Sequence, residues 1–163
     1  MLTGDNDAKI REWFGALASE GRYEVTDDIK AKISEDFCAG FCDDEDTKKT
    51  ISSIYEKYSY VCDTHTAVAV KVYEDYRKAT GDTTRTLIAS TASPYKFSSS
   101  VLEAICPCFS ADDEYALVDK INELSGITIP ESLAGLKNKP VRFSGSIDKE
   151  SMSDYVMEQL NVK

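Results

Sequence analysis

Two hydroxyl side chains stand where a folded chain could use them for chemistry. Ser90 and Thr91 end an apolar run and come shortly before Pro94, in the stretch "TLIASTASPYKFSSSVLEAI" at residues 86–105. A hydroxyl both donates and accepts hydrogen bonds, so it can contact an unprotonated ring nitrogen without placing a charge beside the ring. The alternative is that both hydroxyls cap turns next to the proline.

Lys96 and His65 are the other candidates for chemistry. Lys96 precedes a predicted helix, so it is either an anion-binding residue that acts with the helix amides or a solvent-exposed lysine. His65 is the sole histidine and lies at the start of another predicted helix, in "CDTHTAVAV". It is either an acid–base group or a hydrogen-bonded structural residue, and no serine or cysteine in a nucleophile motif accompanies it. The sequence therefore identifies no catalytic residue.

The cysteines do not form a metal-binding pattern. They are odd in number, no pair has the C-x2-C spacing, and a single histidine accompanies them. We expect reduced, mostly buried thiols and no metal site. The cysteines are Cys38, Cys42, Cys62, Cys106 and Cys108.

Length and charge restrict the classes of protein to which the chain can belong. The 163 residues suffice for one domain, and 42% hydrophobic with 29% charged residues is typical of a globular protein. A formal net charge of -10 argues against nucleic acid as a partner, because that binding depends on lysine and arginine. No apolar stretch is long enough to span a membrane, and the N-terminus does not resemble a signal peptide, so we expect a cytoplasmic protein without membrane partners.

Helical hydrophobic spacing surrounds the candidate residues. One predicted strand, at residues 86–90, carries the two hydroxyls at its carboxyl end, where ligands bind in open α/β sheets. Ser100 and Glu103 match an S-x-x-E capping box, which predicts a helix that begins there. The other predicted helices cover about residues 7–19, 26–40, 43–58, 63–81, 110–125 and 148–160, with a short helical piece at Pro130 and brief strands near Tyr60 and at 141–143.

These elements predict an α/β fold that is mostly helical, with helices packed around a few short strands. We expect a single unit over residues 1–163, with a helical lead-in at 1–60, an α/β segment at 61–108 and carboxyl-terminal helices at 109–163. A strand cannot satisfy its own backbone groups, so residues 86–90 require sheet partners. These are either the brief strands of this chain or strands of polypeptide outside it.

Two motifs resemble the C-terminal region of the threonine synthase family. The members of this family are pyridoxal-phosphate enzymes of fold type II. "YSYVCDTHTAVAVKVYEDY" and "LIASTASPYKFSSSVLEAI" are similar to the family forms "GYxxDPHTAVA" and "xTAHPAKF", in the same order. The sequence departs from these forms at Thr64, where proline is usual, at Ser93, where histidine is usual, and at Tyr95, where a small residue is usual.

The resemblance implies a cofactor and a reaction. Thr91 would lie against the pyridine nitrogen of pyridoxal phosphate, with Ser90 beside it, and His65 and Lys96 would lie near the substrate or an anion. The family converts O-phosphohomoserine and water to threonine and phosphate. In the family, a lysine and a glycine-rich loop of the N-terminal part hold the cofactor, and the eight scattered glycines here form no such loop.

The chain therefore looks like a C-terminal fragment, expected to be inactive and not to bind the cofactor alone. Its expected partners are the N-terminal part of the same enzyme and, through exposed apolar surface, other copies of itself. Two alternatives stay open. One is a fragment of a related β-replacement enzyme, and the other is a helical interaction module without an active site, which recruits a partner chain through the strand edge.

Overall fold

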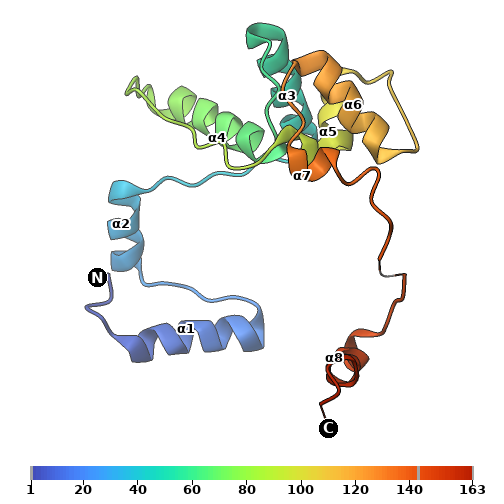
Figure 1. Ribbon diagram of the computed structural model, residues 1–163. Helices are drawn as coiled ribbons and strands as arrows, with labels where there is room; N and C mark the ends of the chain where they lie inside the picture. Colours follow the sequence, from blue (N-terminus) through green and yellow to red (C-terminus); the bar gives the residue numbers. More distant parts are fainter. Residues whose placement is uncertain (1, 143, 163) are drawn as a thin grey trace. The chain divides into compact units, whose positions relative to one another are not determined.

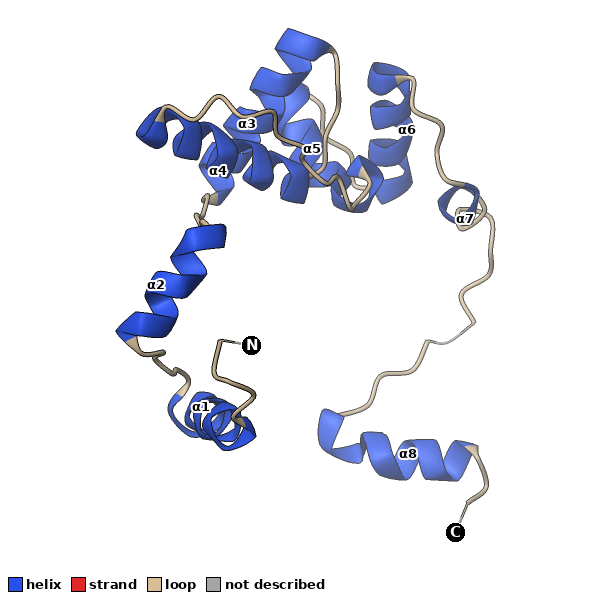
Figure 2. Cartoon of the chain, turned by 90° about the vertical axis from the view of Figure 1, so that its left-hand side faces the viewer, coloured by secondary structure: helices blue, strands red, loops and turns tan. Residues whose placement is uncertain are grey.

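A computed structural model describes residues 2–142 and 144–162, and all regular secondary structure within them is helical (Figures 1 and 2). The contacts group into two compact units, Met1–Gly126 and Ile127–Lys163. The first unit contains α1 (Asp7–Glu20), α2 (Asp27–Asp36), α3 (Asp44–Tyr58), α4 (Thr64–Thr80), the 3-10 helix η1 (Pro94–Phe97), α5 (Ser98–Ile105) and α6 (Glu114–Ser125). The second contains α7 (Glu131–Ala134), the 3-10 helix η2 (Lys149–Ser151) and α8 (Met152–Gln159).

Local capping signals explain where the principal helices begin and end. The Asp43 side chain accepts a hydrogen bond from the Asp46 amide at 2.8 Å and so caps the start of α3. Gly81 and Gly126 end α4 and α6 in the left-handed conformation, with φ of 72° and 66°. These boundaries agree with the sequence-based prediction.

The core of the first unit lies where α3, α4, α5 and α6 meet. Helix α3 packs against α4 and α5, and α5 also packs against α6 and η1. Figure 2 shows α5 between α3 and α6. The apolar side chains buried there come from all four helices and from the segment before α4, and they are Ile51, Val61, Ala67, Val101, Leu102, Val118 and Ile121.

The predicted strand at residues 86–90 is not formed, which corrects the α/β part of the fold prediction. Within the described residues, no backbone hydrogen bond joins residues 83–92 to another backbone group. The segment instead runs back beside α4, where Ile88 is half-buried while Leu87 is 93% exposed. A strand exists only as part of a ladder, and no described segment supplies the second strand.

The brief strands are also absent from the described part of the chain. Tyr60 lies in an irregular link between α3 and α4, and residues 141–142 carry no strand. Phe143, the third residue of that predicted strand, lies outside the described residues.

The predicted capping box of Ser100 and Glu103 is wrong because the helix begins earlier. The Ser93 hydroxyl accepts a hydrogen bond from the Tyr95 amide at 3.4 Å and starts η1, and α5 follows η1 directly. Ser100 therefore lies inside α5. Glu103 instead pairs with Lys48 of α3 and accepts a hydrogen bond from Ser99 at 3.2 Å.

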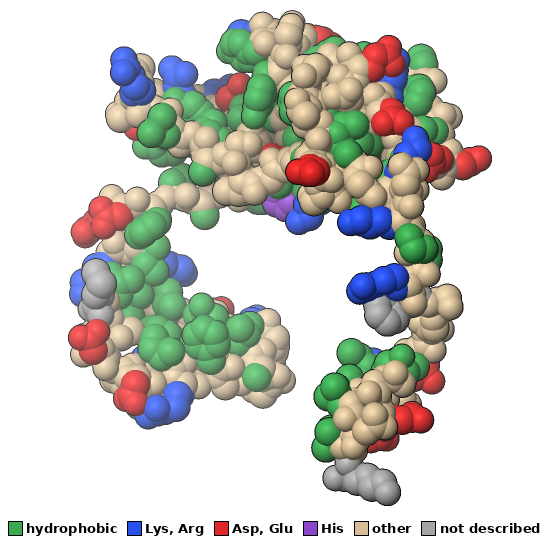
Figure 3. All heavy atoms as spheres, in the orientation of Figure 1, with side chains coloured by type: hydrophobic (Ala, Val, Ile, Leu, Met, Phe, Trp, Pro, Cys, Tyr) green, Lys and Arg blue, Asp and Glu red, His purple; other side chains and the backbone are tan. Residues whose placement is uncertain are grey.

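Two helices keep apolar faces exposed (Figure 3). In α1, Trp13 is buried and stacks on Tyr23 at 6.1 Å between ring centroids, whereas Phe14 is 60% exposed. In α8, Val156 and Leu160 follow the predicted apolar spacing but are 49% and 64% exposed. The amphipathic pattern correctly predicts both helices, although most of each apolar face is uncovered within its own unit.

Candidate functional site

The N-terminus of α4 is built around a fully buried carboxylate. Asp63 is 0% exposed, and its Oδ1 accepts hydrogen bonds from the amides of His65 at 2.9 Å and Thr66 at 3.3 Å. Its Oδ2 accepts a hydrogen bond from the hydroxyl of Thr66. Asp63 therefore caps the helix and accepts three donors, two of which belong to buried Thr66.

His65 lies at the rim of this helix end. Its side chain is 63% exposed, Nδ1 is 3.3 Å from Asp63 Oδ1, and its ring lies 5.0 Å from the ring of Phe97 with a 52° tilt. Lys96 places its ammonium group 5.5 Å from the centre of the Phe97 ring. The two predicted anion-neighbourhood residues therefore both lie against one aromatic side chain.

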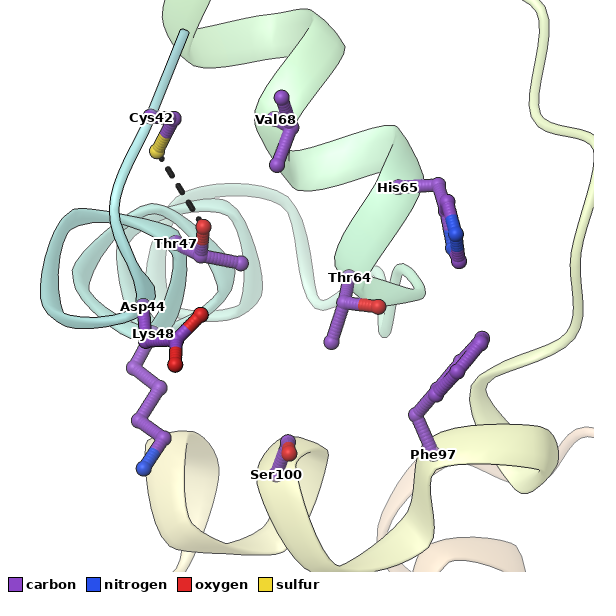
Figure 4. A pocket seen from close by; sticks show the side chains of 9 residues that line it. All are labelled: Cys42, Asp44, Thr47, Lys48, Thr64, His65, Val68, Phe97 and Ser100. Carbon is purple, nitrogen blue, oxygen red and sulfur yellow. Dashed lines mark hydrogen bonds between the residues drawn. The ribbon is translucent and has the colours of Figure 1, made fainter. Parts of the chain in front are cut away.

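A cavity of about 330 Å³ opens beside His65, between α3, α4 and α5. Figure 4 shows His65 and Phe97 next to each other on one wall, with Lys48 and Asp44 on the opposite side. Its lining residues are Cys42, Asp44, Thr47, Lys48, Thr64, His65, Val68, Phe97 and Ser100. Thr64, which replaces the usual proline of the family form, therefore faces this cavity.

An ion pair joins two walls of this cavity. Lys48 of α3 pairs with Glu103 of α5, and this pairing raises the pKa of Lys48 and lowers the pKa of Glu103. Both side chains are 40% or more exposed, so solvent screening keeps the energetic contribution small. The pair holds both residues ionised near neutral pH.

The two hydroxyls of the opening motif differ in their surroundings. Ser90 Oγ lies 2.9 Å from Thr66 Oγ1 and is hydrogen bonded to it, which brings the two motifs together across the start of α4. Thr91 is exposed, and its hydroxyl has no hydrogen-bond partner among the described residues. The available hydroxyl is therefore that of Thr91, while that of Ser90 is already engaged.

Asp63 and Thr66 are site residues that the sequence reasoning did not select. The sequence predicts a helix over about residues 63–81 but selects neither side chain for the site. The spacing in the sequence could have identified both residues, because an aspartate followed three residues later by a threonine places both side chains at the same helix end. Their bond to Ser90 spans 24 residues and has no sequence signature.

The cysteines are free thiols in three kinds of surroundings. Cys38 and Cys108 are exposed, Cys42 and Cys106 are intermediate, and Cys62 is buried. No group of three or more histidine, cysteine, aspartate or glutamate side chains is arranged to hold a metal in the described ranges. Burial raises the pKa of the Cys62 thiol from 9.0 to about 11, with a smaller contribution from the Asp63 carboxylate.

Cys62 is expected to resist thiol-reactive reagents in the folded protein. A two-unit rise in pKa lowers the thiolate fraction at neutral pH by about 100-fold, and burial adds a steric barrier. Iodoacetamide followed by peptide mass spectrometry should find Cys38 and Cys108 modified and Cys62 unmodified until denaturant is added. Modification of Cys62 at the rate of Cys108 would contradict this assignment. Since the folded-state pKa is the higher one, the stability present below pH 9 should fall between pH 9 and about 11.

No described helix is long and apolar enough to cross a lipid bilayer.

The chain matches a known protein family over more than half of its length. Residues 66–156 match the family model described as "Threonine synthase, C-terminal", a range that contains Ser90, Thr91 and Lys96. The threonine synthase of Methylobacillus glycogenes is 29% identical over 162 residues, which cover 98% of this chain and 30% of that protein. Human "Threonine synthase-like 1" is 32% identical over 105 residues, which cover 64% of this chain and 14% of that protein.

Two solved structures have a similar fold. The crystal structure of the yeast threonine synthase matches with a TM-score of 0.68 and 27% identity, over 94% of this chain and 30% of that one. The pyridoxal-phosphate-bound threonine synthase from Brucella melitensis matches with a TM-score of 0.58 and 24% identity, over 78% of this chain and 25% of that one.

The chain belongs to the threonine synthase family and corresponds to its C-terminal region. It spans about 30% of the length of the threonine synthases of M. glycogenes and yeast. This result confirms the resemblance that the two motifs suggested.

Proposed function

We propose that the chain forms one wall of the pyridoxal-phosphate site of a threonine synthase, which converts O-phosphohomoserine and water to threonine and phosphate. The observation that carries the proposal is the family match over residues 66–156, which includes both hydroxyls of the opening motif. The alignment with the yeast and M. glycogenes enzymes along nearly the whole chain supports it further.

The residues present fit a neutral contact to the ring nitrogen of this cofactor. Thr91 is exposed and has no hydrogen-bond partner in the described part of the chain, so its hydroxyl is free to donate or accept. When bound, pyridoxal phosphate supplies an electron sink for elimination and replacement at an amino acid. A hydroxyl in place of a carboxylate at the ring nitrogen would leave the ring less electron-poor, which suits this chemistry.

The neighbouring residues have supporting roles in the proposal. Lys96 and His65 flank Phe97, where the Lys96 ammonium group would provide a positive charge and His65 a hydrogen-bonding ring for the phosphate of the substrate. Ser90 would lie beside the cofactor while bonded to Thr66. None of these residues performs a covalent step, and we assign no catalytic residue to this chain.

The rest of the site would come from polypeptide that corresponds to the remaining length of the relatives. We infer that this partner carries the lysine that forms the Schiff base and the glycine-rich loop for the cofactor phosphate. The chain studied alone should release no phosphate from O-phosphohomoserine, whereas the protein in its full native length should do so. Phosphate release by the chain alone would contradict this division of the site.

Replacing Thr91 by valine in the full-length enzyme should lower turnover by about 10- to 100-fold. The change removes one hydrogen bond to the ring nitrogen at nearly constant volume, a loss of about 1.4–2.7 kcal/mol. Steady-state kinetics and the absorbance of the bound cofactor should both change. Thr91→Ser should preserve both, and Thr83→Val is a matched control in the same exposed segment. Unchanged spectra and rate in Thr91→Val would refute the contact.

A second candidate function is recruitment of another chain through residues 86–89. Leu87 is 93% exposed, and the backbone around it has no backbone partner within the described residues. Such a segment favours pairing with another strand.

If this segment is exposed in solution, the chain should self-associate. Sedimentation velocity should show a weight-average mass that rises with concentration, and Leu87→Asp should reduce this rise by placing a charge in the contact. Val141→Asp is the matched control, since Val141 is an 85% exposed apolar residue of the other unit. A monomer at every concentration would count against the recruitment function.

A further inference from the structure

Three polar side chains connect the start of α4 to the hydroxyl segment. Asp63 Oδ1 accepts two backbone amides and Oδ2 accepts the hydroxyl of Thr66, so both carboxylate oxygens act as acceptors. Thr66 Oγ1 also lies 2.9 Å from Ser90 Oγ. The single hydroxyl of Thr66 therefore contacts both the buried carboxylate of Asp63 and the hydroxyl of Ser90.

The hydroxyl segment has few other constraints. Residues 83–92 make no backbone-to-backbone hydrogen bond in the described ranges, so side chains must hold the segment in place. Near its beginning, the Tyr76 hydroxyl donates to the Asp82 carboxylate at 3.0 Å, and Arg77 Nε donates to the Asp82 carbonyl at 3.3 Å. Near its end, the anchor is the bond between Thr66 and Ser90, and the anchors at both ends come from α4.

We infer that Asp63 and Thr66 are positioning residues, which fix Ser90 and therefore the adjacent Thr91 beside the start of α4. Asp63 is fully buried and Thr66 is 5% exposed, so this part of the network is rigidly packed, whereas Ser90 is exposed. The bond between Thr66 and Ser90 ties the end of the hydroxyl segment to this packed network. Thr91 is the next residue, and its own hydroxyl makes no hydrogen bond among the described residues.

The significance for catalysis rests on the proposed function, but the positioning can be measured without any cofactor. Backbone 15N relaxation of the chain reports the order of each residue, and we compare Thr66→Val with Thr66→Ser. Valine keeps the β-branched shape of threonine and leaves the two hydrogen bonds from backbone amides to Asp63 in place. It removes only the hydroxyl. The order parameters of Ser90 and Thr91 should fall from about 0.85 to about 0.6 or lower in Thr66→Val, and serine should restore them.

Ser90→Ala tests the same bond from the exposed side, where a change in folding is not expected. It should lower the order parameter of Thr91 as much as Thr66→Val does. The double variant with Thr66→Val and Ser90→Ala should lower this order parameter no further than either single variant. Tyr76→Phe is the matched control, because it removes one hydrogen bond from α4 at the other end of the segment and should leave the order parameter of Thr91 unchanged.

The inference is overturned if Ser90 and Thr91 keep their order parameters in Thr66→Val and Ser90→Ala, or if Thr66→Ser behaves like Thr66→Val. If Thr66 served only the N-terminus of α4, Ser90 and Thr91 would keep their order parameters in both variants. Because the measurement needs no cofactor or substrate, its failure is distinct from a failure of the Thr91→Val turnover experiment.

Discussion

Replacing Leu102 by alanine is expected to lower the free energy of unfolding by about 2–5 kcal/mol. Leu102 is 1% exposed and lies in α5, the helix that packs against both α3 and α6. The substitution removes buried apolar atoms and leaves a cavity that three helices cannot close without moving together. A loss of this size is a large part of the stability of a small domain.

Urea unfolding followed by circular dichroism measures this loss, and the chain contains a matched control. Leu87→Ala is the same chemical change at a side chain that is 93% exposed, so its effect on stability should be close to zero. Equal losses for the two variants would contradict the core that the structure defines.

Asp63→Ala should cost about 2–4 kcal/mol, because three donors, two of them on buried Thr66, lose their acceptor at once. The amides of His65 and Thr66 and the hydroxyl of Thr66 all donate to this carboxylate, which is 0% exposed. Loss of an N-cap costs about 1 kcal/mol, and a buried donor without a partner costs a further 1–3 kcal/mol. Urea unfolding measures the total, and helical circular dichroism should fall as the first turn of α4 frays.

Asp113→Ala provides the control for a cap at the surface. Asp113 also caps a helix, accepting the Tyr115 amide at 3.1 Å, but it is exposed, so water replaces the lost acceptor. The loss at Asp113 should therefore be clearly smaller than the loss at Asp63. If the two losses were equal, burial of the Asp63 network would contribute nothing.

Most helices of the first unit could be predicted because their signals lie within a few residues of each other. Asp63 caps α4 through residues two and three positions away, and Gly81 ends the same helix through its own backbone conformation. The motifs "CDTHTAVAV" and "LIASTASPYKF" also sufficed to suggest the family, which the match over residues 66–156 confirmed.

The errors arose where a local pattern depended on a distant segment. Residues 86–90 have the composition of a strand, yet no described segment forms a ladder with them. Ser100 and Glu103 have the spacing of a capping box, yet η1 starts the helix earlier and Lys48 of α3 pairs with Glu103. In both cases the local sequence pattern was present, but the structure around it did not supply the sheet partner or the helix start that the pattern required.

The amino-acid order was therefore sufficient for the helices, their caps and the membership of the family, since short-range hydrogen bonds and apolar spacing specify them. The folded arrangement alone revealed that Thr66 meets Ser90 across 24 residues and that the Thr91 hydroxyl has no hydrogen-bond partner among the described residues. Such contacts depend on how α4 packs against the rest of the unit, and the energy of that packing is shared among residues far apart in the chain.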